Sequence, residues 1–282
     1  MGFPVNEACG LCDGVRAQAH FTKEGVDYHR CPECGFEFSR PAANPNFQDS
    51  LAGFEDSYLQ YLENQDADRV NHARLFAWMN AFGPVGAGGV LDVGCGSGKF
   101  VRFLRAQGLA AEGLEPSQPL YDRYLARELF RRGSHEGLGA LGRPPYAAIT
   151  LLDVLEHVES PTALFQGIHK ALAPGGSLYL STPDVGSLMA RVLGPRWHFY
   201  NKYHLSYFSP RTLTRLCDRT GFKVRGVSHL GKRFPVGYLL RYAKDFLLGK
   251  GTRGQGKPSA LDAISVPLNT FDIMYACLEK TP

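Results

Sequence analysis

The sequence lacks any run of apolar residues that approaches the roughly 20 needed to cross a bilayer. Its first residues also lack the basic and then apolar pattern of a secretion signal, and Asn6 stands where a myristoylation pattern needs serine or threonine. Since the sequence has neither a membrane span nor a targeting segment, we expect a cytoplasmic protein.

Charge of one sign is also scarce, because 31 lysines and arginines stand against 27 aspartates and glutamates, for a net charge of +4. The charged residues are interspersed except in a basic segment at 249–258, whereas a dedicated nucleic-acid-binding protein usually carries a strong basic stripe. We therefore expect no nucleic-acid partner. What the chain does have is 282 residues, 44% of them hydrophobic, which is enough to bury a large core.

A glycine-rich turn is the most informative feature that is present. An apolar run ends at Asp92 and leads into three glycines at alternating positions, Gly94, Gly96 and Gly98, before a helix-compatible stretch. Glycine is needed where the backbone takes a positive φ or lies within contact distance of a ligand. A dinucleotide fingerprint would need a glycine where Lys99 stands, so the spacing argues against NAD. The pattern predicts a strand, a turn that holds another nucleotide-like cofactor, and a helix.

Two later segments continue this pattern. Residues 110–115 are typical of a second strand that ends in Glu115, about 20 residues after the turn, where an acid in a Rossmann-like sheet accepts hydrogen bonds from ribose hydroxyls. The alternative for Glu115 is a solvent-exposed carboxylate at the end of a strand. Residues 148–152 form a buried type of strand, and the sequence Asp-Val-Leu-Glu-His-Val follows at 153–158.

The Asp-x-Gly-x-Gly-x-Gly pattern of residues 92–98 resembles motif I of class I S-adenosylmethionine (SAM) methyltransferases. The Leu-Glu-His-Val stretch of residues 155–158 resembles the segment after strand four in ubiquinone-type and related small-molecule methyltransferases. This resemblance implies an α/β fold with a Rossmann-like, mostly parallel sheet of seven strands and helices on both faces. It also implies that SAM is the cofactor and that a methyl group is transferred to a small-molecule acceptor.

The resemblance also assigns the residues that should bind SAM. From the turn and the strands that follow it, we expect contacts from Asp92, Gly94, Cys95, Gly96, Gly98, Glu115, Pro116, Ser134, Asp153 and Val154. Ser134 stands in this set for the adenine edge, because residues 132–136 show no clear adenine-contacting acid. In the family, an N-terminal helix with tyrosines and an arginine often covers the cofactor, which points to Tyr61 and to Arg69 or Arg74. The alternative is core tyrosines and an exposed arginine.

Four of the seven cysteines form two Cys-x-x-Cys pairs, Cys9 with Cys12 and Cys31 with Cys34. Two spacer residues let both sulfurs of a pair turn inward, and two such knuckles can close on one tetrahedral Zn²⁺. Four thiolates leave no open coordination position, so we expect structural zinc in a ribbon with short strands at 19–22 and 26–29. The alternatives are two unrelated cysteine pairs or two disulfides, which a reducing cytosol disfavours.

Residues 172–180 indicate a helix stop, a turn and a fifth strand. The segment that follows, residues 182–213, resembles a common substrate-site segment of small-molecule methyltransferases. Ligands in open α/β sheets bind outside the carboxyl ends of the strands, so this loop should overhang the methyl group. We expect the substrate to contact Trp197, His198, Tyr207 and Phe208. His204 is the first candidate for a general base and His157 the second, because imidazole can move a proton near neutral pH. A structural role is the alternative for either histidine.

The predicted domains are a zinc ribbon (1–42), a helical linker that covers the cofactor (43–84), and a SAM-binding domain (85–282) with an insertion at 232–270. Residues 221–229 and 273–279 fit its last two strands. Between them lie an amphipathic helix at 234–248 and the basic linker at 249–258. The insertion is interpreted as a substrate lid, a foot on an anionic membrane, or a surface helix packed on the sheet, with membrane contact the least favoured.

Three functions are compatible with the sequence. The first is a SAM-dependent methyltransferase acting on a small molecule, with O-methylation ahead of C- or N-methylation. The second is an RNA methyltransferase whose ribbon grips RNA, although Thr182-Pro-Asp184 stands where nucleic-acid amino methyltransferases have Asn-Pro-Pro-aromatic. The third is a SAM-fold scaffold whose ribbon recruits a protein partner, against which the intact glycine turn and Glu115 argue. The acceptor and the oligomeric state do not follow from the sequence.

Overall fold

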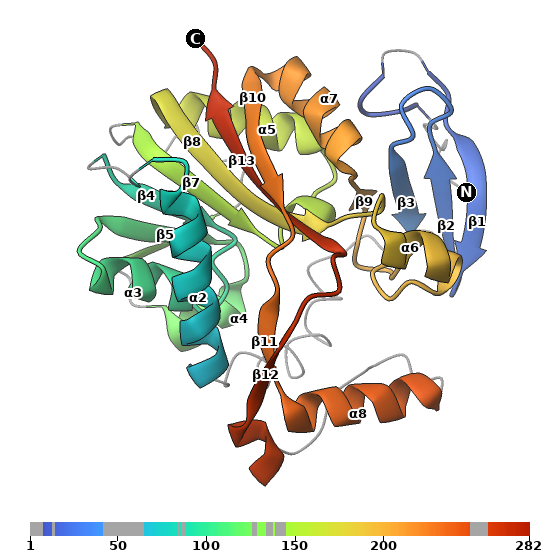
Figure 1. Ribbon diagram of the computed structural model, residues 1–282. Coiled ribbons are helices and arrows are strands. Elements are labelled where there is room, and N and C mark those ends of the chain that lie inside the picture. The colour runs from blue at the N-terminus through green and yellow to red at the C-terminus, as the bar shows by residue number, and fades with distance from the viewer. Residues whose placement is uncertain are drawn as a thin grey trace. The chain divides into compact units, whose positions relative to one another are not determined.

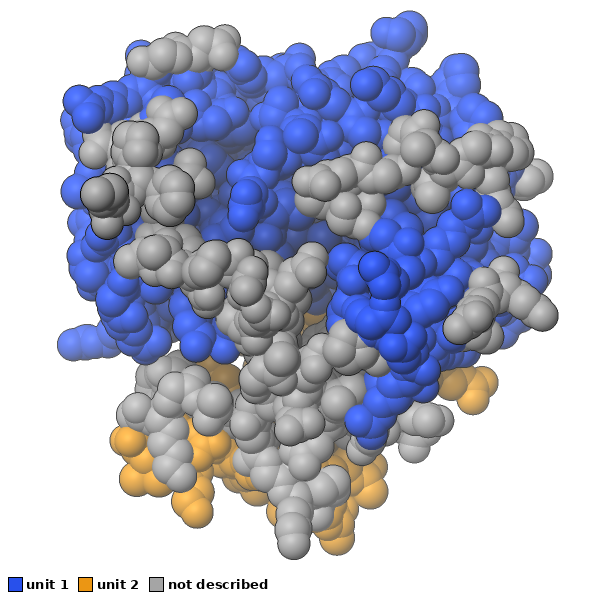
Figure 2. All heavy atoms as spheres, turned by 180° about the vertical axis from the view of Figure 1, so that it is seen from behind, with its two compact units in different colours: residues 1–45, 79–229, 271–282 blue, residues 46–78, 230–270 orange. Residues whose placement is uncertain are grey.

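The computed structural model describes residues 8–12, 15–41, 65–83, 85, 88–125, 129–133, 138, 145–248 and 259–282 of the chain. These residues belong to two compact units, which Figure 2 colours separately. Unit 1 comprises residues 1–45, 79–229 and 271–282, and unit 2 comprises residues 46–78 and 230–270. The segment predicted to be a ribbon therefore falls in the same unit as the large sheet. Most of the predicted linker and of the predicted insertion fall together in unit 2.

Unit 1 is built on a seven-stranded sheet in the order β10-β13-β8-β7-β4-β5-β6 (Figure 1). Its strands are β4 (Val90–Val93), β5 (Ala111–Glu115), β6 (Phe130–Arg132), β7 (Tyr146–Leu152), β8 (Leu172–Pro183), β10 (Phe222–Ser228) and β13 (Ile273–Lys280). β13 runs antiparallel to both of its neighbours, and the other described pairings are parallel. The prediction of a mostly parallel sheet of seven strands is confirmed.

The order of the strands decides on which face of the sheet the helices of unit 1 lie. These helices are α3 (Lys99–Ala106), α4 (Gln118–Tyr124), α5 (Pro161–Ala171), α6 (Leu188–Leu193) and α7 (Pro210–Thr220), with 3₁₀ turns η2 (Leu155–His157) and η3 (Gly194–Arg196). The crossovers through α3 and α5 leave β4 and β7 in opposite directions, and crossovers between parallel strands are right-handed. α3 and α5 therefore lie on opposite faces of the sheet. Where the order reverses, between β4 and β7, the carboxyl ends of the strands form the crevice in which such sheets bind ligands.

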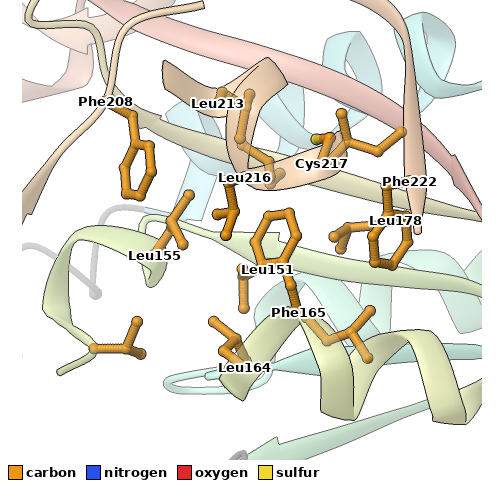
Figure 3. Packing of buried hydrophobic residues seen from close by; sticks show 14 of the residues in the cluster. Leu151, Leu155, Leu164, Phe165, Leu178, Phe208, Leu213, Leu216, Cys217 and Phe222 are labelled. Carbon is orange, nitrogen blue, oxygen red and sulfur yellow. The ribbon is translucent and has the colours of Figure 1, made fainter. Parts of the chain in front are cut away.

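Apolar side chains from α5 and α7 pack against the sheet in the core shown in Figure 3. α5 begins at Ser160, whose hydroxyl accepts the Ala163 N–H, and it buries Phe165 against the ring of Phe222 at 5.6 Å between centroids. Leu216 of α7 is also fully buried in this cluster. This core packs α5 and α7 against β7, whose carboxyl end borders the crevice.

A second sheet of unit 1 contains the cysteine-rich segment. Its strands are β1 (Gln18–Lys23), β2 (Val26–Arg30), β3 (Glu37–Pro41) and β9 (Ser206–Tyr207). The two strands predicted around Glu24-Gly25 are confirmed, and both residues of this turn have positive φ, 53° and 76°. The sequence analysis did not predict β3, nor that β9 from the substrate loop would pair antiparallel with it.

Three further elements differ from the sequence predictions. β8 begins at Leu172, whereas residues 172–180 were predicted to contain a helix stop and a turn before the strand. Its pairing with β7 jumps from Leu172 opposite Tyr146 to Ser177 opposite Ala148, so a bulge holds the extra residues. In unit 2, the helix predicted from 234 begins at Val236, because Lys232–Pro235 form β11 instead. β11 pairs antiparallel with β12, at Ser265–Leu268.

The remaining elements of unit 2 are most of α2 (Gln65–Asn80), α8 (Val236–Leu247) and the 3₁₀ turn η4 (Ala260–Ala263). The Arg241 guanidinium of α8 forms two hydrogen bonds to the Asp262 carboxylate of η4, at 2.8 and 3.0 Å. Among the residues that the structure describes, no helix is both long enough and apolar enough to span a bilayer.

Truncation of the core should be costly. Phe165→Ala removes a fully buried ring, so we expect the free energy of unfolding to fall by about 3–5 kcal/mol. Gln166→Ala, at the exposed neighbouring position, should change it by no more than about 0.5 kcal/mol. Urea unfolding followed by circular dichroism measures both changes, and a Phe165→Ala loss as small as that of the control would contradict the packing.

Candidate active site

The glycine-rich turn after β4 has the backbone geometry that its sequence predicts. Gly94, Gly96 and Gly98 all have positive φ, at 72°, 54° and 73°. A Cβ on Gly94 would lie 2.5 Å from Val154 Cγ2, and one on Gly98 would lie 2.4 Å from Phe130 Cζ. Conformation and space therefore both require glycine at Gly94 and Gly98. The same contact places Val154, after β7, directly against the turn.

Two buried carboxylates organise this turn. Glu115, at the end of β5, accepts the Gly96 N–H at 2.8 Å with one oxygen and the Ser117 N–H at 2.9 Å with the other. Asp92, at the end of β4, accepts the Thr150 hydroxyl at 2.6 Å. A carboxylate offers about four acceptor positions, so each acid retains capacity for a hydroxyl or amine of a ligand.

Burial disfavours the ionised form of both acids. Desolvation raises the pKa of Asp92 to about 7, and the nearby Glu115 charge adds to this effect. Desolvation also raises the pKa of Glu115 to about 6, although the two N–H groups that it accepts oppose the shift. A cationic ligand, or one that donates hydrogen bonds, would favour the ionised carboxylates.

The segment after β7 leads away from the turn through a strained residue. Asp153 has a φ of 55°, which is uncommon for a residue other than glycine. Its N–H donates to the Ser181 hydroxyl at 3.0 Å, and that hydroxyl donates to Asp153 Oδ1 at 2.6 Å. This reciprocal pair ties the carboxyl ends of β7 and β8 together and starts η2 in a defined direction.

Three ionisable residues meet at the end of η2. Ligand atoms of Glu156, His157 and His204 all lie within 4.8 Å of one another, although His204 comes from the loop before β9. The imidazole rings of His157 and His204 have centroids 4.7 Å apart. The Thr182 hydroxyl donates to Glu156 Oε2 at 3.0 Å. The structure thus brings together the two histidines that the sequence analysis proposed as bases.

The hydrogen bonds of this cluster constrain which histidine nitrogens carry protons. His157 Nδ1 lies 2.9 Å from the Tyr203 carbonyl oxygen, which can only accept, so Nδ1 is protonated and Nε2 carries the lone pair. His204 Nδ1 is buried and has no hydrogen-bond partner. Desolvation lowers the pKa of His157, and desolvation together with the neighbouring His157 lowers that of His204 well below 6.5. Both imidazoles are therefore neutral at pH 7.

Two kinds of chemistry are open to such a group. A neutral imidazole with an unsatisfied lone pair can accept a proton from an acceptor molecule. One carboxylate and two imidazoles could equally hold a divalent cation, because these are common ligands of Zn²⁺, Fe²⁺ and Mn²⁺. Sequence reasoning missed Glu156 and Thr182. The position of Glu156 beside His157 was the one available signal.

The structure places the predicted substrate contacts mostly in packed surroundings. Trp197 and Phe208 are fully buried, and the Trp197 indole N–H donates to Asp272 Oδ2 at 3.0 Å. Tyr207 is also buried and donates its hydroxyl to the His204 carbonyl oxygen at 2.9 Å. His198 is partly exposed, 3.9 Å from Asp272. A substrate contact stays a prediction for all four, and the structure gives Trp197, Tyr207 and Phe208 a packing role that the sequence did not indicate.

Some predicted cofactor contacts cannot be related to the turn. Tyr61 and Ser134 lie outside the described residues. Arg69 is exposed on the part of α2 that belongs to unit 2. Cys95, by contrast, lies within the turn, and its Sγ is close to Gly113, because a Cβ added to Gly113 would come 2.6 Å from it. Pro116 is exposed after β5.

The four cysteines of the ribbon segment form a separate buried cluster. Cys9 Sγ lies 3.7 Å from Cys34 Sγ, and Cys31 Sγ lies 3.8 Å from Cys12 Sγ. Zinc–sulfur bonds of 2.3 Å in a tetrahedron separate the sulfurs by about 3.8 Å, whereas a disulfide needs about 2.05 Å. The N–H groups of Leu11 and Phe36 donate to Cys9 Sγ and Cys34 Sγ at 3.4 Å each.

The electrostatics of the four buried thiols also favour a bound cation. Desolvation raises the pKa of Cys9, and it raises that of Cys12 to about 11, with the adjacent thiols adding to both shifts. Four thiolates at this separation repel one another unless a positive charge lies between them. The donor set and the spacing therefore fit a tetrahedral zinc ion.

Together, the switch-point crevice, the glycine turn and the two acids define a class I SAM-dependent methyltransferase. The model of the methyltransferase domain family matches residues 61–227, more than half of the chain, and the chain belongs to that family. The resemblance proposed from the motifs is thereby confirmed.

Relatives and solved structures agree with this assignment. The ubiquinone biosynthesis O-methyltransferase of Aliivibrio fischeri (strain MJ11) is 26% identical over 230 residues, which cover 71% of this chain and 95% of the relative. The enzyme of the same name from Xanthomonas axonopodis pv. citri (strain 306) is 29% identical over 177 residues, covering 56% and 72%.

Two solved structures illustrate the shared fold. A SAM-dependent methyltransferase from Thermotoga maritima, described as a possible histamine N-methyltransferase, has a TM-score of 0.53 at 15% identity and covers 84% of this chain and 100% of its own. The plantazolicin methyltransferase in complex with a triazolic desmethylPZN analog and SAH has a TM-score of 0.52 at 15% identity, covering 81% and 91%. At these identities the likeness concerns the fold alone.

The raised pKa of Asp92 gives a testable pH dependence. Between roughly pH 4 and pH 7 the folded, ligand-free protein holds a proton that the unfolded chain has released, so its free energy of unfolding should fall as pH rises through this window. Asp92→Asn keeps an acceptor for Thr150 and should remove a decline of roughly 2–4 kcal/mol. Urea unfolding from pH 4.5 to 8 measures it.

Asp122→Asn, on the exposed surface of α4, is the matched control and should keep the wild-type pH profile. Parallel profiles for wild type and Asp92→Asn would contradict the buried, protonated state of Asp92.

Proposed function

We propose that this methyltransferase transfers the methyl group of SAM to an oxygen of a small-molecule acceptor. The observation that carries the proposal is the proximity of two sites at one edge of the sheet. Val154 contacts the glycine turn, and the cluster of Glu156 and His157 with His204 begins two residues further along the same segment. A cofactor at the turn and an acceptor at the cluster would lie next to each other.

On the cofactor side, the turn would bind SAM through its backbone at Gly94, Cys95, Gly96 and Gly98. The carboxylates of Asp92 and Glu115 would accept hydrogen bonds from amine or hydroxyl groups of the cofactor, and its positive charge would favour their ionised forms. Pro116, Ser134, Asp153 and Val154 complete the proposed cofactor set, and Tyr61 and Arg69 stay in it as predictions from the sequence. Bound SAM supplies an electrophilic methyl group on its sulfonium and departs as S-adenosylhomocysteine.

On the acceptor side, the protein has to align the nucleophile, exclude water and remove a proton. We assign proton removal from an acceptor hydroxyl to His204 Nδ1, the buried atom without a hydrogen-bond partner. The lowered pKa of His204 keeps this nitrogen in its neutral form at pH 7. His157 would take the proton if the acceptor approaches from the η2 side. The names of the relatives in ubiquinone biosynthesis support an oxygen acceptor.

The experiment that tests this function starts from the co-purifying cofactor. Mass spectrometry of the native protein should detect SAM or S-adenosylhomocysteine, and incubation with SAM and a panel of phenols, carboxylic acids and amines should yield a product heavier by the mass of one methylene. Methylation of total RNA instead would support the RNA alternative. Cofactor binding without transfer to any small molecule or RNA would favour the scaffold.

For the acceptor that is found, His204→Gln should lower kcat by about 10²–10⁴-fold, because it removes the proposed base. Its affinity for SAM, measured by calorimetry, should stay within about twofold. His169→Gln, a histidine of α5 that packs on Gly221, is the control and should keep full activity. A His204→Gln variant that loses SAM binding together with activity would show a structural histidine.

The same assay separates a base from a cation site. If the cluster holds a divalent cation, activity should depend on added Zn²⁺, Fe²⁺ or Mn²⁺, and Glu156→Gln should abolish this dependence. If the cluster acts through imidazole alone, added cations should leave kcat unchanged.

We also propose that Cys9, Cys12, Cys31 and Cys34 bind one structural Zn²⁺. The spacing of the sulfurs and the N–H donors to Cys9 and Cys34 support it. A zinc ion so bound would supply much of the folding free energy of a segment that has little core of its own.

Native protein should contain one zinc ion per chain by plasma mass spectrometry, and Cys31→Ser should release it. We expect the released form to be cleaved by protease within residues 8–41 and to keep its affinity for SAM, because the turn lies on the other sheet. Cys217→Ala, a buried cysteine of α7, should retain the metal. A metal-free native protein with Cys9 and Cys12 in a disulfide would disprove the zinc site.

A further inference from the structure

The ribbon segment and the substrate loop are parts of one sheet. β3 of the ribbon pairs antiparallel with β9, so that Glu37 faces Tyr207 and Phe38 faces Ser206 across the ladder. Aromatic rings continue the contact, since Phe36 lies 5.0 Å from Phe208 between centroids. The ribbon is thus attached to the chain segment that carries His204, on the acceptor side of the proposed site.

One residue of this loop, Leu205, makes backbone hydrogen bonds in two directions. The Leu205 carbonyl accepts the N–H of Ser39 at 3.0 Å, while the Leu205 N–H donates to the backbone oxygen of Glu156 at 2.7 Å. Ser39 is completely buried, and its hydroxyl donates to the His204 carbonyl at 2.7 Å. A continuous series of hydrogen bonds therefore runs from β3 through His204 and Leu205 to Glu156.

The beginning of the same loop is fixed by two other ribbon residues. The Lys23 ammonium donates to the carbonyl oxygens of Trp197, at 3.2 Å, and Tyr200, at 2.8 Å. The Tyr200 hydroxyl donates to the buried carboxylate of Glu37 at 2.5 Å. Contacts from β1 and β3 thus bracket residues 197–205.

The His204 imidazole is packed among three rings. Its Nδ1 has no hydrogen-bond partner, the rings of His157, Phe199 and Tyr207 lie 4.7, 5.9 and 6.3 Å away between centroids, and the ring also interacts with the backbone of Phe199. Where the imidazole lies among these groups depends on the position of the His204 backbone, and Ser39 Oγ and the Tyr207 hydroxyl both donate to that backbone at the His204 carbonyl. A reacting group must be held to within about 0.5 Å of its productive geometry.

We propose that Ser39, from the cysteine-rich ribbon, is a positioning residue for the acceptor site, which it serves by fixing the backbone of His204 and its distance from Glu156. The ribbon is then an integral wall of the methyl-transfer site and not an appended binding module. This inference rests on the proposed role of the cluster in methyl transfer, and it goes beyond that role by assigning a function to a side chain of β3.

The test compares Ser39→Ala with Thr22→Ala in the full-length, metal-bound protein. Both variants remove one hydroxyl from the ribbon, but Thr22 is exposed and donates to Asp27 at 2.7 Å, away from the loop. Protein labelled with ¹³C at histidine Cε1 gives one signal for each imidazole, and His157→Gln and His204→Gln assign the two signals of the cluster. Ser39→Ala should shift both of these signals and leave that of His169 unchanged, whereas Thr22→Ala should shift none.

Turnover provides the second measurement once an acceptor is available. Ser39→Ala should lower kcat by between about 10- and 100-fold, the loss expected when a reacting group moves by about 1 Å. Its Kd for SAM and its zinc content should stay within about twofold of wild type. Unchanged signals of His157 and His204, or an unchanged kcat, would overturn the proposal.

Tyr207→Phe keeps the test decisive if Ser39→Ala does not fold. This change removes the other hydroxyl that donates to the His204 carbonyl and keeps the buried ring. It should shift the same two histidine signals, and a lack of any shift would count against the proposal. If the protein proves to transfer no methyl group, the histidine signals still report on positioning, so failure of the function and failure of this inference give different results.

Discussion

The pairing of β3 with β9 is the constraint on which the arrangement of unit 1 depends. Without it, the loop at 197–208 would keep its bonds to Glu156, His157 and Asp272 but would lose its strand pairing with the ribbon. With it, the backbone of Leu205 is held between Ser39 and Glu156. This explains why the ribbon segment belongs to the same compact unit as the methyltransferase sheet.

The charges at the carboxyl edge of the large sheet follow from the same close packing. Asp92, Glu115 and Glu156 are all buried there, and each is held by a neutral donor, from Thr150, Gly96 or Thr182. Neutral donors orient a carboxylate but do not compensate its charge, so burial raises the pKa of Asp92 and Glu115. Buried acids held by neutral donors favour a cationic ligand at this edge, and SAM carries a positive sulfonium.

Much of the fold was predictable because its signals are local. The strands around residues 90–93 and 148–152 are short, mostly apolar runs, and the turn after the first needs glycine at positions where any side chain would collide. The turn at Glu24-Gly25 and the two strands beside it were predictable for the same reason. Predictions failed where the secondary structure of a segment depended on partners far away in the sequence. β9 is two residues long and has no periodicity of its own, and its strand character comes from pairing with a segment more than 160 residues away.

The sequence by itself determined the chemistry of two sites, because glycines at alternating positions and cysteines at fixed spacing act through the backbone within a few residues. It therefore indicated the cofactor turn, the acids after β4 and β5, and the four sulfurs of the ribbon. Only the tertiary structure decided which residues meet at the acceptor side. Whether Trp197 and Tyr207 line a pocket or pack inside the protein depends on which surface covers them, and that surface is the ribbon. Burial and long-range strand pairing are properties of the folded chain, so no local pattern could place Glu156, His204 and Ser39 together.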